Sequence, residues 1–160
     1  MPSGDWKYRS LEDNSTYTSD DGFSETTFTV PDREVWHILS VWAELTATAN
    51  ITTAREVRVL VQDAAPDVIL EMAAGVAPDT SADFLFAPGA PDLTAARDTD
   101  LVMTSLPTGL LLRPGWTLLV RAIADTSDTD GDSDVMVVQL IYGIENVMST
   151  AGGTPQTSDN

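Results

Sequence analysis

The middle of the chain alternates apolar and polar residues with a period of two, and turn residues interrupt the alternation about every ten positions. A period of two places successive side chains on opposite faces of a β-strand. Short strands at this spacing are typical of a β-sandwich or barrel. We therefore predict an all-β fold with strands near 26–30, 35–47, 55–62, 68–73, 82–87, 101–105, 116–124 and 135–145.

Proline and glycine mark two corners, at 106–109 (LPTG) and 113–115 (RPG), on either side of a short apolar run at 110–112 (LLL). Proline cannot donate to a β-ladder, so these corners border strands. Corners of this kind let a chain cross between two sheets, which favours a jelly roll over a simple meander. We predict a single antiparallel β-sandwich, a jelly roll of about eight strands, over residues 26–145.

The two ends of the chain differ from the middle. Residues 1–25 are polar and without a period, yet they contain Trp6, Tyr8 and Tyr17. Because aromatic residues are enriched in protein interfaces, we expect an extended N-terminal arm that contacts a neighbour; the alternative is a disordered leader. Residues 146–160 are rich in glycine, serine and threonine, which predicts a flexible C-terminal tail.

The segment 35–47 presents a choice of faces. Its odd-numbered positions from Val35 to Leu45 are mostly valine and leucine, and the even-numbered face holds Trp36, Ile38 and Trp42. If the valine and leucine face is the core, the other three form an apolar outer patch, which predicts an interface. The opposite assignment, with the tryptophans inside, stays open. Either alternative predicts an oligomer or an assembled state.

The charge of the chain limits its partners. The chain has a formal net charge of −17 and a pI near 4.1. An acidic surface of this kind repels phosphate backbones and anionic lipid, so we expect neither nucleic acid nor a membrane as partner. No apolar run reaches the ~18 residues of a transmembrane helix, and the polar, acidic N-terminus does not resemble a signal peptide. We expect synthesis in a cytoplasm. The lack of cysteine excludes catalytic thiolates, cysteine-bound zinc and disulfides.

Residues for catalysis are sparse in the sequence. His37 is the sole histidine, and its place inside a predicted strand favours a packed side chain over a triad or metal site. The chain has no nucleophile elbow and no phosphate-binding or dinucleotide-binding motif. A pair of carboxylates at glycosidase separation stays open. We predict no enzymatic activity and no catalytic residues.

Alternating aspartates around Gly131 form the most distinctive local motif. Hard oxygen ligands at this spacing suit calcium, and the first half resembles an EF-hand loop. The likeness ends at Ser133, where such a loop needs its glycine, and at Gln139, where it needs a bidentate glutamate. A solvated hairpin loop is the alternative, and we expect no other cofactor. The calcium ligands of the first hypothesis are Asp128, Asp130, Asp132 and Asp134.

Six segments form one pattern of strands and corners: VP (30–31), VWHILSV (35–41), VRVLVQD (57–63), VILEMAAG (68–75), FLFAPG (84–89) and LPTGLLLRPGWTLLVRAIAD (106–125). Together they resemble the small β-sandwich proteins that decorate or cement the capsids of tailed bacteriophages. The resemblance covers residues 26–145, and in place of the small residue or glycine that follows the first proline in that pattern this chain has Asp32-Arg33-Glu34.

This resemblance implies a non-enzymatic virion structural protein that decorates and stabilises the outer surface of a capsid. Its partner would be the major capsid protein lattice, bound through many repeated weak contacts, and it would form a homotrimer as a closed ring. The alternatives are a phage tail or receptor-binding module that presents loops 88–100 and 125–134 to a host glycan, and a secreted carbohydrate-binding sandwich. The expected contact residues are Trp6, Tyr8, Tyr17, Trp36, Ile38 and Trp42.

Overall fold

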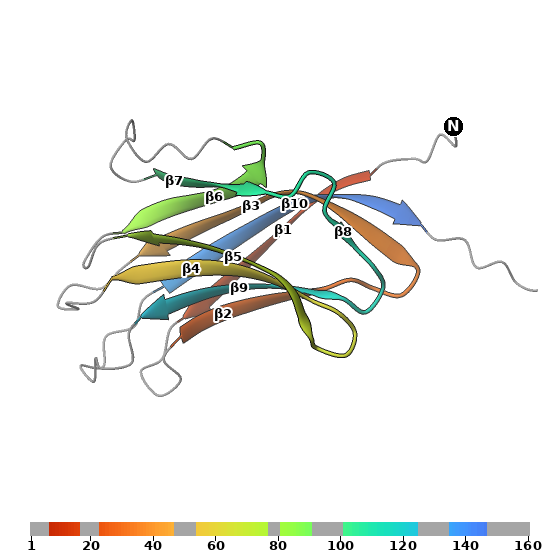
Figure 1. Cartoon of the computed structure of the whole chain (residues 1–160), viewed down its shortest axis with the longest axis horizontal. Helices are drawn as coiled ribbons and strands as arrows, with labels where there is room; N and C mark the ends of the chain where they lie inside the picture. Colours follow the sequence, from red (N-terminus) through yellow and green to blue (C-terminus); the bar gives the residue numbers. More distant parts are fainter. Residues whose placement is uncertain are drawn as a thin grey trace, which may run out of the picture.

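The computed structural model describes residues 7–16, 23–46, 54–76, 81–90, 101–124 and 135–146. Every regular element in these ranges is a β-strand (Figure 1), which confirms the predicted all-β class. The strands are β1 (Lys7–Thr16), β2 (Phe23–Thr29), β3 (Glu34–Thr46), β4 (Arg55–Gln62), β5 (Val68–Val76), β6 (Ala82–Pro88), β7 (Leu101–Leu106), β8 (Leu111–Leu112), β9 (Thr117–Ala124) and β10 (Val135–Asn146).

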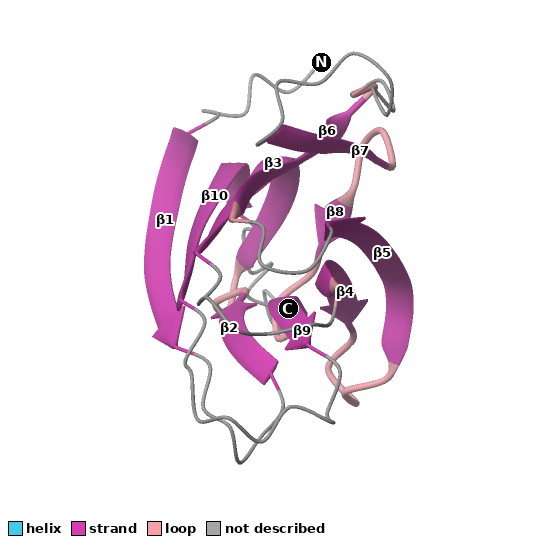
Figure 2. Ribbon diagram, turned by 90° about the vertical axis from the view of Figure 1, so that its left-hand side faces the viewer, coloured by secondary structure: helices cyan, strands magenta, loops and turns pink. Residues whose placement is uncertain are grey.

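The strands form two sheets that pack face to face (Figure 2). Sheet A has the order β1-β10-β3-β6-β7, with β8 beside β3, and sheet B has the order β2-β9-β4-β5. Without β7 and β8, the strand orders are 1-10-3-6 and 2-9-4-5, which is the double Greek key of a jelly roll. The jelly-roll prediction is confirmed, with β7 and β8 inserted between β6 and β9.

The insertion breaks the antiparallel pattern that the sequence predicted. Strands β6 and β7 pair in parallel, from Asp83 opposite Leu101 to Pro88 opposite Leu106. Parallel neighbours need a connection of about a dozen residues or more to bring the chain back, and residues 89–100 provide that length. The prediction of a purely antiparallel sandwich is therefore wrong at this one edge of sheet A.

The sandwich also begins earlier than residue 26. Strand β1 pairs with β10 along its whole length, from Lys7 opposite Ile144 to Thr16 opposite Val135. The predicted boundary of the arm is wrong there, because a backbone ladder to β10 needs no apolar period in β1. Residues 1–6, 17–22 and 147–160, which hold Trp6, Tyr17 and most of the predicted tail, lie outside the described residues.

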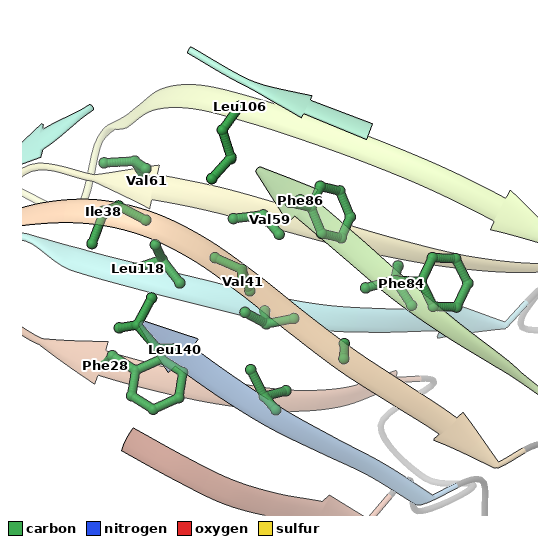
Figure 3. Close-up of a cluster of buried hydrophobic side chains, with 14 of the residues drawn as sticks. Phe28, Ile38, Val41, Val59, Val61, Phe84, Phe86, Leu106, Leu118 and Leu140 are labelled. Atoms are coloured by element: carbon green, nitrogen blue, oxygen red, sulfur yellow. The ribbon is translucent and has the colours of Figure 1, made fainter. Parts of the chain in front are cut away.

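The core fills the space between the two sheets (Figure 3). Phenylalanine, valine and leucine side chains from both inner faces are fully buried there, and each such side chain stabilises the fold by about 1.5–3 kcal/mol. Labelled members include Phe28, Ile38, Val41, Val59, Phe84, Phe86, Leu118 and Leu140. The core thereby fixes which face of every strand is left to solvent.

Strand β3 contains a β-bulge at Leu39. Ser40 pairs with Ile141 and Ile38 pairs with Tyr142, so Leu39 has no partner in the ladder to β10. One extra residue in a strand reverses the alternation of faces on one side of it. Before the bulge the even-numbered residues of β3 face the core, and after it the odd-numbered residues do.

The bulge corrects the predicted outer patch. Trp36 and Ile38 are 3% and 2% exposed and belong to the core, so their predicted place on an outer patch is wrong. Beyond the bulge the prediction holds, because Val41 is buried and Trp42 lies half-buried on the outer face. The open alternative, with the tryptophans inside, is correct for Trp36 only. Before the bulge, His37 points outward with its odd-numbered neighbours.

Trp36 is held in the core by two contacts. Its Nε1 donates to Glu34 Oε2 at 2.8 Å, and its ring packs on Tyr142 with centroids 4.2 Å apart and planes tilted by 37°. A tilted aromatic pair adds about 0.5–1.5 kcal/mol beyond burial. This end of β3 is therefore firmly attached to β10.

The predicted proline-glycine corner joins the two sheets. Gly115 has a φ of +77°, a conformation that glycine adopts without strain. Its N–H donates to Val30 O at 3.0 Å, and Val30 N–H donates to Trp116 O at 2.9 Å. The turn between β2 and β3 holds Arg33 at a φ of +70°, a conformation that glycine adopts more readily.

Candidate binding surface

Exposed apolar side chains gather on the outer face of sheet A. Three of them lie at neighbouring positions of β3, β8 and β10: Leu39 (38% exposed), Leu111 (44%) and Ile141 (39%). Ile141 pairs with Ser40, next to Leu39, and Leu111 pairs with His37. We name Leu39, Leu111 and Ile141 the apolar patch. Exposed apolar residues that lie together on one face make that face a candidate for protein contact.

His37 lies at the centre of the apolar patch. His37 is directly opposite Gly143 on β10. Because glycine has no side chain, nothing on Gly143 lies between His37 and Glu145, the next outward position of β10. The His37 Nε2 atom lies 3.3 Å from Glu145 Oε2. Within the described ranges no group of three or more histidine, aspartate and glutamate side chains is placed to hold a metal ion. His37 therefore lies half-buried on the outer face, next to Glu145.

A half-buried row continues this face toward the other edge of sheet A. Trp42 pairs with Leu85 on β6, and Leu85 pairs with Met103 on β7. All three are half-buried on the outer face, and Trp42 follows the bulge by only a few positions. We name these three residues the outer row. Together, the apolar patch and the outer row extend apolar surface across the sheet from β8 and β10 to β7.

An acidic pair borders the outer row. Glu44 on β3 is directly opposite Asp83 on β6, and both belong to the outer face. Neither carboxylate forms an ion pair with another described residue. Strands β3, β6, β7, β8 and β10 contain no lysine or arginine. Like charges directly opposite each other destabilise a sheet, so this arrangement costs the free chain stability.

The outer face of sheet B carries the opposite like-charge pair. Arg58 on β4 is directly opposite Arg121 on β9. Arg121 Nε donates to Glu25 Oε2 at 2.7 Å, and Arg58 donates to Glu56 and, at 3.0 Å, to Glu71 Oε1. The hydrogen bond to Glu56 raises the pKa of Arg58, desolvation opposes this shift, and the charges of Glu56 and Glu71 raise it further. Each arginine is therefore neutralised within the chain.

Apolar residues on the outer face of sheet B are shielded as well. Leu60 pairs with Leu119 in the row next to the arginines, and the two are only 8% and 6% exposed. Arginine stems commonly cover apolar surface in this way. Val68 and Ile69 at the edge strand β5 are the exposed exceptions. The broad face of sheet B is therefore closed, in contrast to that of sheet A.

The remaining predicted site residues fall outside this surface. The aspartates of the calcium hypothesis, residues 128–134, lie outside the described residues, and calcium binding stays a prediction. Tyr8 pairs with Gly143 through β1. No helix in the described part of the chain is long and apolar enough to cross a membrane. The sequence missed Leu39, Leu111 and Ile141 as a group, because only the bulge and the strand register bring them together.

Comparison with known proteins identifies no family. No family model matches the chain, and no curated protein matches it. Among solved structures, a CocE/NonD family hydrolase from Staphylococcus aureus matches with 12% identity and a TM-score of 0.45, over 91% of this chain and 37% of the hydrolase. This chain thus spans little more than a third of that protein. The BFDV capsid protein, solved as a 60-mer, matches with 11% identity and a TM-score of 0.45, over 96% of this chain and 100% of its own.

Proposed function

We propose that this chain is a non-enzymatic structural protein of the virion, which decorates and stabilises a tailed-phage capsid by binding the major capsid protein lattice from outside. The choice of a capsid rests on the resemblance of residues 26–145 to decoration proteins. Jelly rolls serve both capsid and lectin domains, so the fold alone does not decide the function. The observation that carries the proposal is the exposed apolar surface on the outer face of sheet A.

That surface suits a broad protein partner. In a chain with a net charge of −17, the apolar patch and the outer row lie on a broad sheet face free of lysine and arginine, apart from the edge strand β1. Small-molecule and catalytic sites are concave with a few convergent polar groups, whereas a sheet face matches another protein surface. A capsid offers the same site many times, and repetition strengthens weak contacts by multivalency.

The first experiment counts this chain in purified virions by quantitative mass spectrometry. Hundreds of copies in a simple ratio to the major shell protein are expected for a decoration protein. A few copies would support the tail or receptor-binding alternative instead. Absence from virions would overturn the proposal, and calcium-dependent glycan binding by the purified chain would then favour a carbohydrate-binding module.

A second experiment tests the surface directly by co-sedimentation with purified shells that lack the chain. The variant Leu111→Ser/Ile141→Ser should lose at least about tenfold in affinity, which corresponds to about 1.4 kcal/mol. The matched control is Val68→Ser/Ile69→Ser, which removes two equally exposed residues from β5 and should bind like the wild type. Equal binding by both variants would contradict docking through sheet A. Analytical ultracentrifugation tests the predicted homotrimer.

A further inference from the structure

The acidic pair beside the outer row indicates what kind of surface docks there. We propose that the partner surface carries arginine or lysine side chains that meet Glu44 and Asp83, next to an apolar contact on Trp42 and Leu85. This inference rests on the proposed function and specifies its partner. It follows from the charges of the two outer faces and from the strand register.

The first step is that the acidic pair of sheet A has no ion pair within the part of the chain that the structure describes. On sheet B the opposed Arg58 and Arg121 are paired with glutamates of the same chain. On sheet A, Glu44 and Asp83 have no ion pair among the described residues, and the strands around them supply no cation. A partner cation would relieve the repulsion in the complex, because opposite charges across an interface attract and like charges repel.

The second step excludes the same face of a second copy as the occupant. A twofold contact through the same face would bring another acidic surface against Glu44 and Asp83, between two chains of −17 net charge each. Nucleic acid and anionic lipid are repelled for the same reason. The occupant that fits this face is therefore a protein surface with both apolar and cationic groups.

The third step concerns the side chains that the partner would use. Two carboxylates at directly opposed positions suit the planar fork of an arginine. Trp42, one outward position from Glu44 on the same strand, offers an aromatic face on which a guanidinium stacks. Lysine would satisfy the charge without the stacking. The wild-type complex should therefore weaken as salt rises, because salt screens charges at the rim of an interface.

The experiment measures affinity for shells that lack the chain at about 0.1 M and about 1 M ionic strength. The variant Glu44→Gln/Asp83→Asn should bind about tenfold more weakly than the wild type at the lower salt and change little at the higher salt. The matched control is Asp32→Asn/Asp67→Asn, which changes the net charge equally at exposed turn positions. It should keep the affinity and the salt dependence of the wild type.

The outcomes separate this inference from the proposed function. If the wild type does not bind shells, both are overturned. If the wild type binds and the double variant behaves like the control, the cationic partner is overturned while capsid binding stands. Tighter binding by Glu44→Gln/Asp83→Asn would also overturn it, since the partner would then present negative or neutral groups. Near-UV circular dichroism of each variant verifies that the sandwich is intact.

Discussion

Sheet A and sheet B each carry two like charges at directly opposed positions of neighbouring strands, Glu44 and Asp83 on one outer face and Arg58 and Arg121 on the other. Sheet B neutralises its arginines with glutamates and shields its outer leucines. Sheet A leaves its two carboxylates without an ion pair among the described residues, beside the half-buried outer row. The same sandwich thus has one outer face whose opposed charges are paired within the chain and one whose opposed charges have no ion pair among the described residues.

Of the predicted changes, the deletion of Leu39 should lower the stability of the fold most. Without the bulge, the residues of β3 before it change faces, so that Trp36 and Ile38 leave the core and His37 enters it. We expect a loss of more than about 4 kcal/mol, or no cooperative unfolding at all, in urea denaturation. The control Leu39→Ala keeps the bulge and should lie within about 0.5 kcal/mol of the wild type. A deletion variant of normal stability would contradict the face assignment.

The two tryptophans of β3 give the next largest contrast. Trp36→Ala should cost about 3–5 kcal/mol in unfolding free energy, because a fully buried ring that packs on Tyr142 is lost. Trp42→Ala removes a half-buried ring from the outer face and should cost less than about 1.5 kcal/mol, while it lowers the affinity for shells. Equal destabilisation by the two substitutions in urea unfolding would contradict the assignment of Trp36 to the core and of Trp42 to the outer face.

Local patterns in the sequence were sufficient to locate the strands after β1 and the corner at Gly115. Alternation predicted strands near 55–62 and 116–124, where the structure has β4 and β9 with Val57, Val59 and Val120 buried, since hydrophobic burial imposes a period of two on a half-exposed strand. The corner at Gly115 was predicted because its conformation restricts the residue type. These features are local, and their physical causes are visible in a few neighbouring residues.

Other features depend on pairing that no local pattern records. The sequence does not predict the bulge at Leu39, because both faces of the predicted strand 35–47 contain apolar residues. Strand β1 is polar and is held by its backbone ladder to β10. Whether an acidic or basic residue is neutralised depends on the register between strands, as with Arg121 and Glu25, which are far apart in the chain. The candidate surface therefore required the three-dimensional structure.

Removing the ion pair between Glu25 and Arg121 on sheet B should leave the repulsion between Arg121 and Arg58 uncompensated by Glu25. Glu25→Gln leaves Arg121 opposed to Arg58, and because these side chains are only partly exposed we expect a loss of about 1 kcal/mol in unfolding free energy. The double variant Glu25→Gln/Arg121→Gln should recover part of that loss, since the repulsion disappears. Added salt should narrow the gap between Glu25→Gln and the wild type. No effect of either substitution would mean that solvent already screens the pair.

Glu44→Gln should change stability by the smallest amount and in the opposite direction. It removes the repulsion with Asp83 without unpairing any cation of the described residues, so we expect a gain of about 0.3 kcal/mol in unfolding free energy, measured by urea denaturation against Glu25→Gln. The same substitution should weaken binding to shells. A loss of stability instead would show that Glu44 has a compensating partner in the free chain. A gain in stability together with a loss in affinity is expected where a face is optimised for contact, because the repulsion that weakens the free chain is relieved only in the complex.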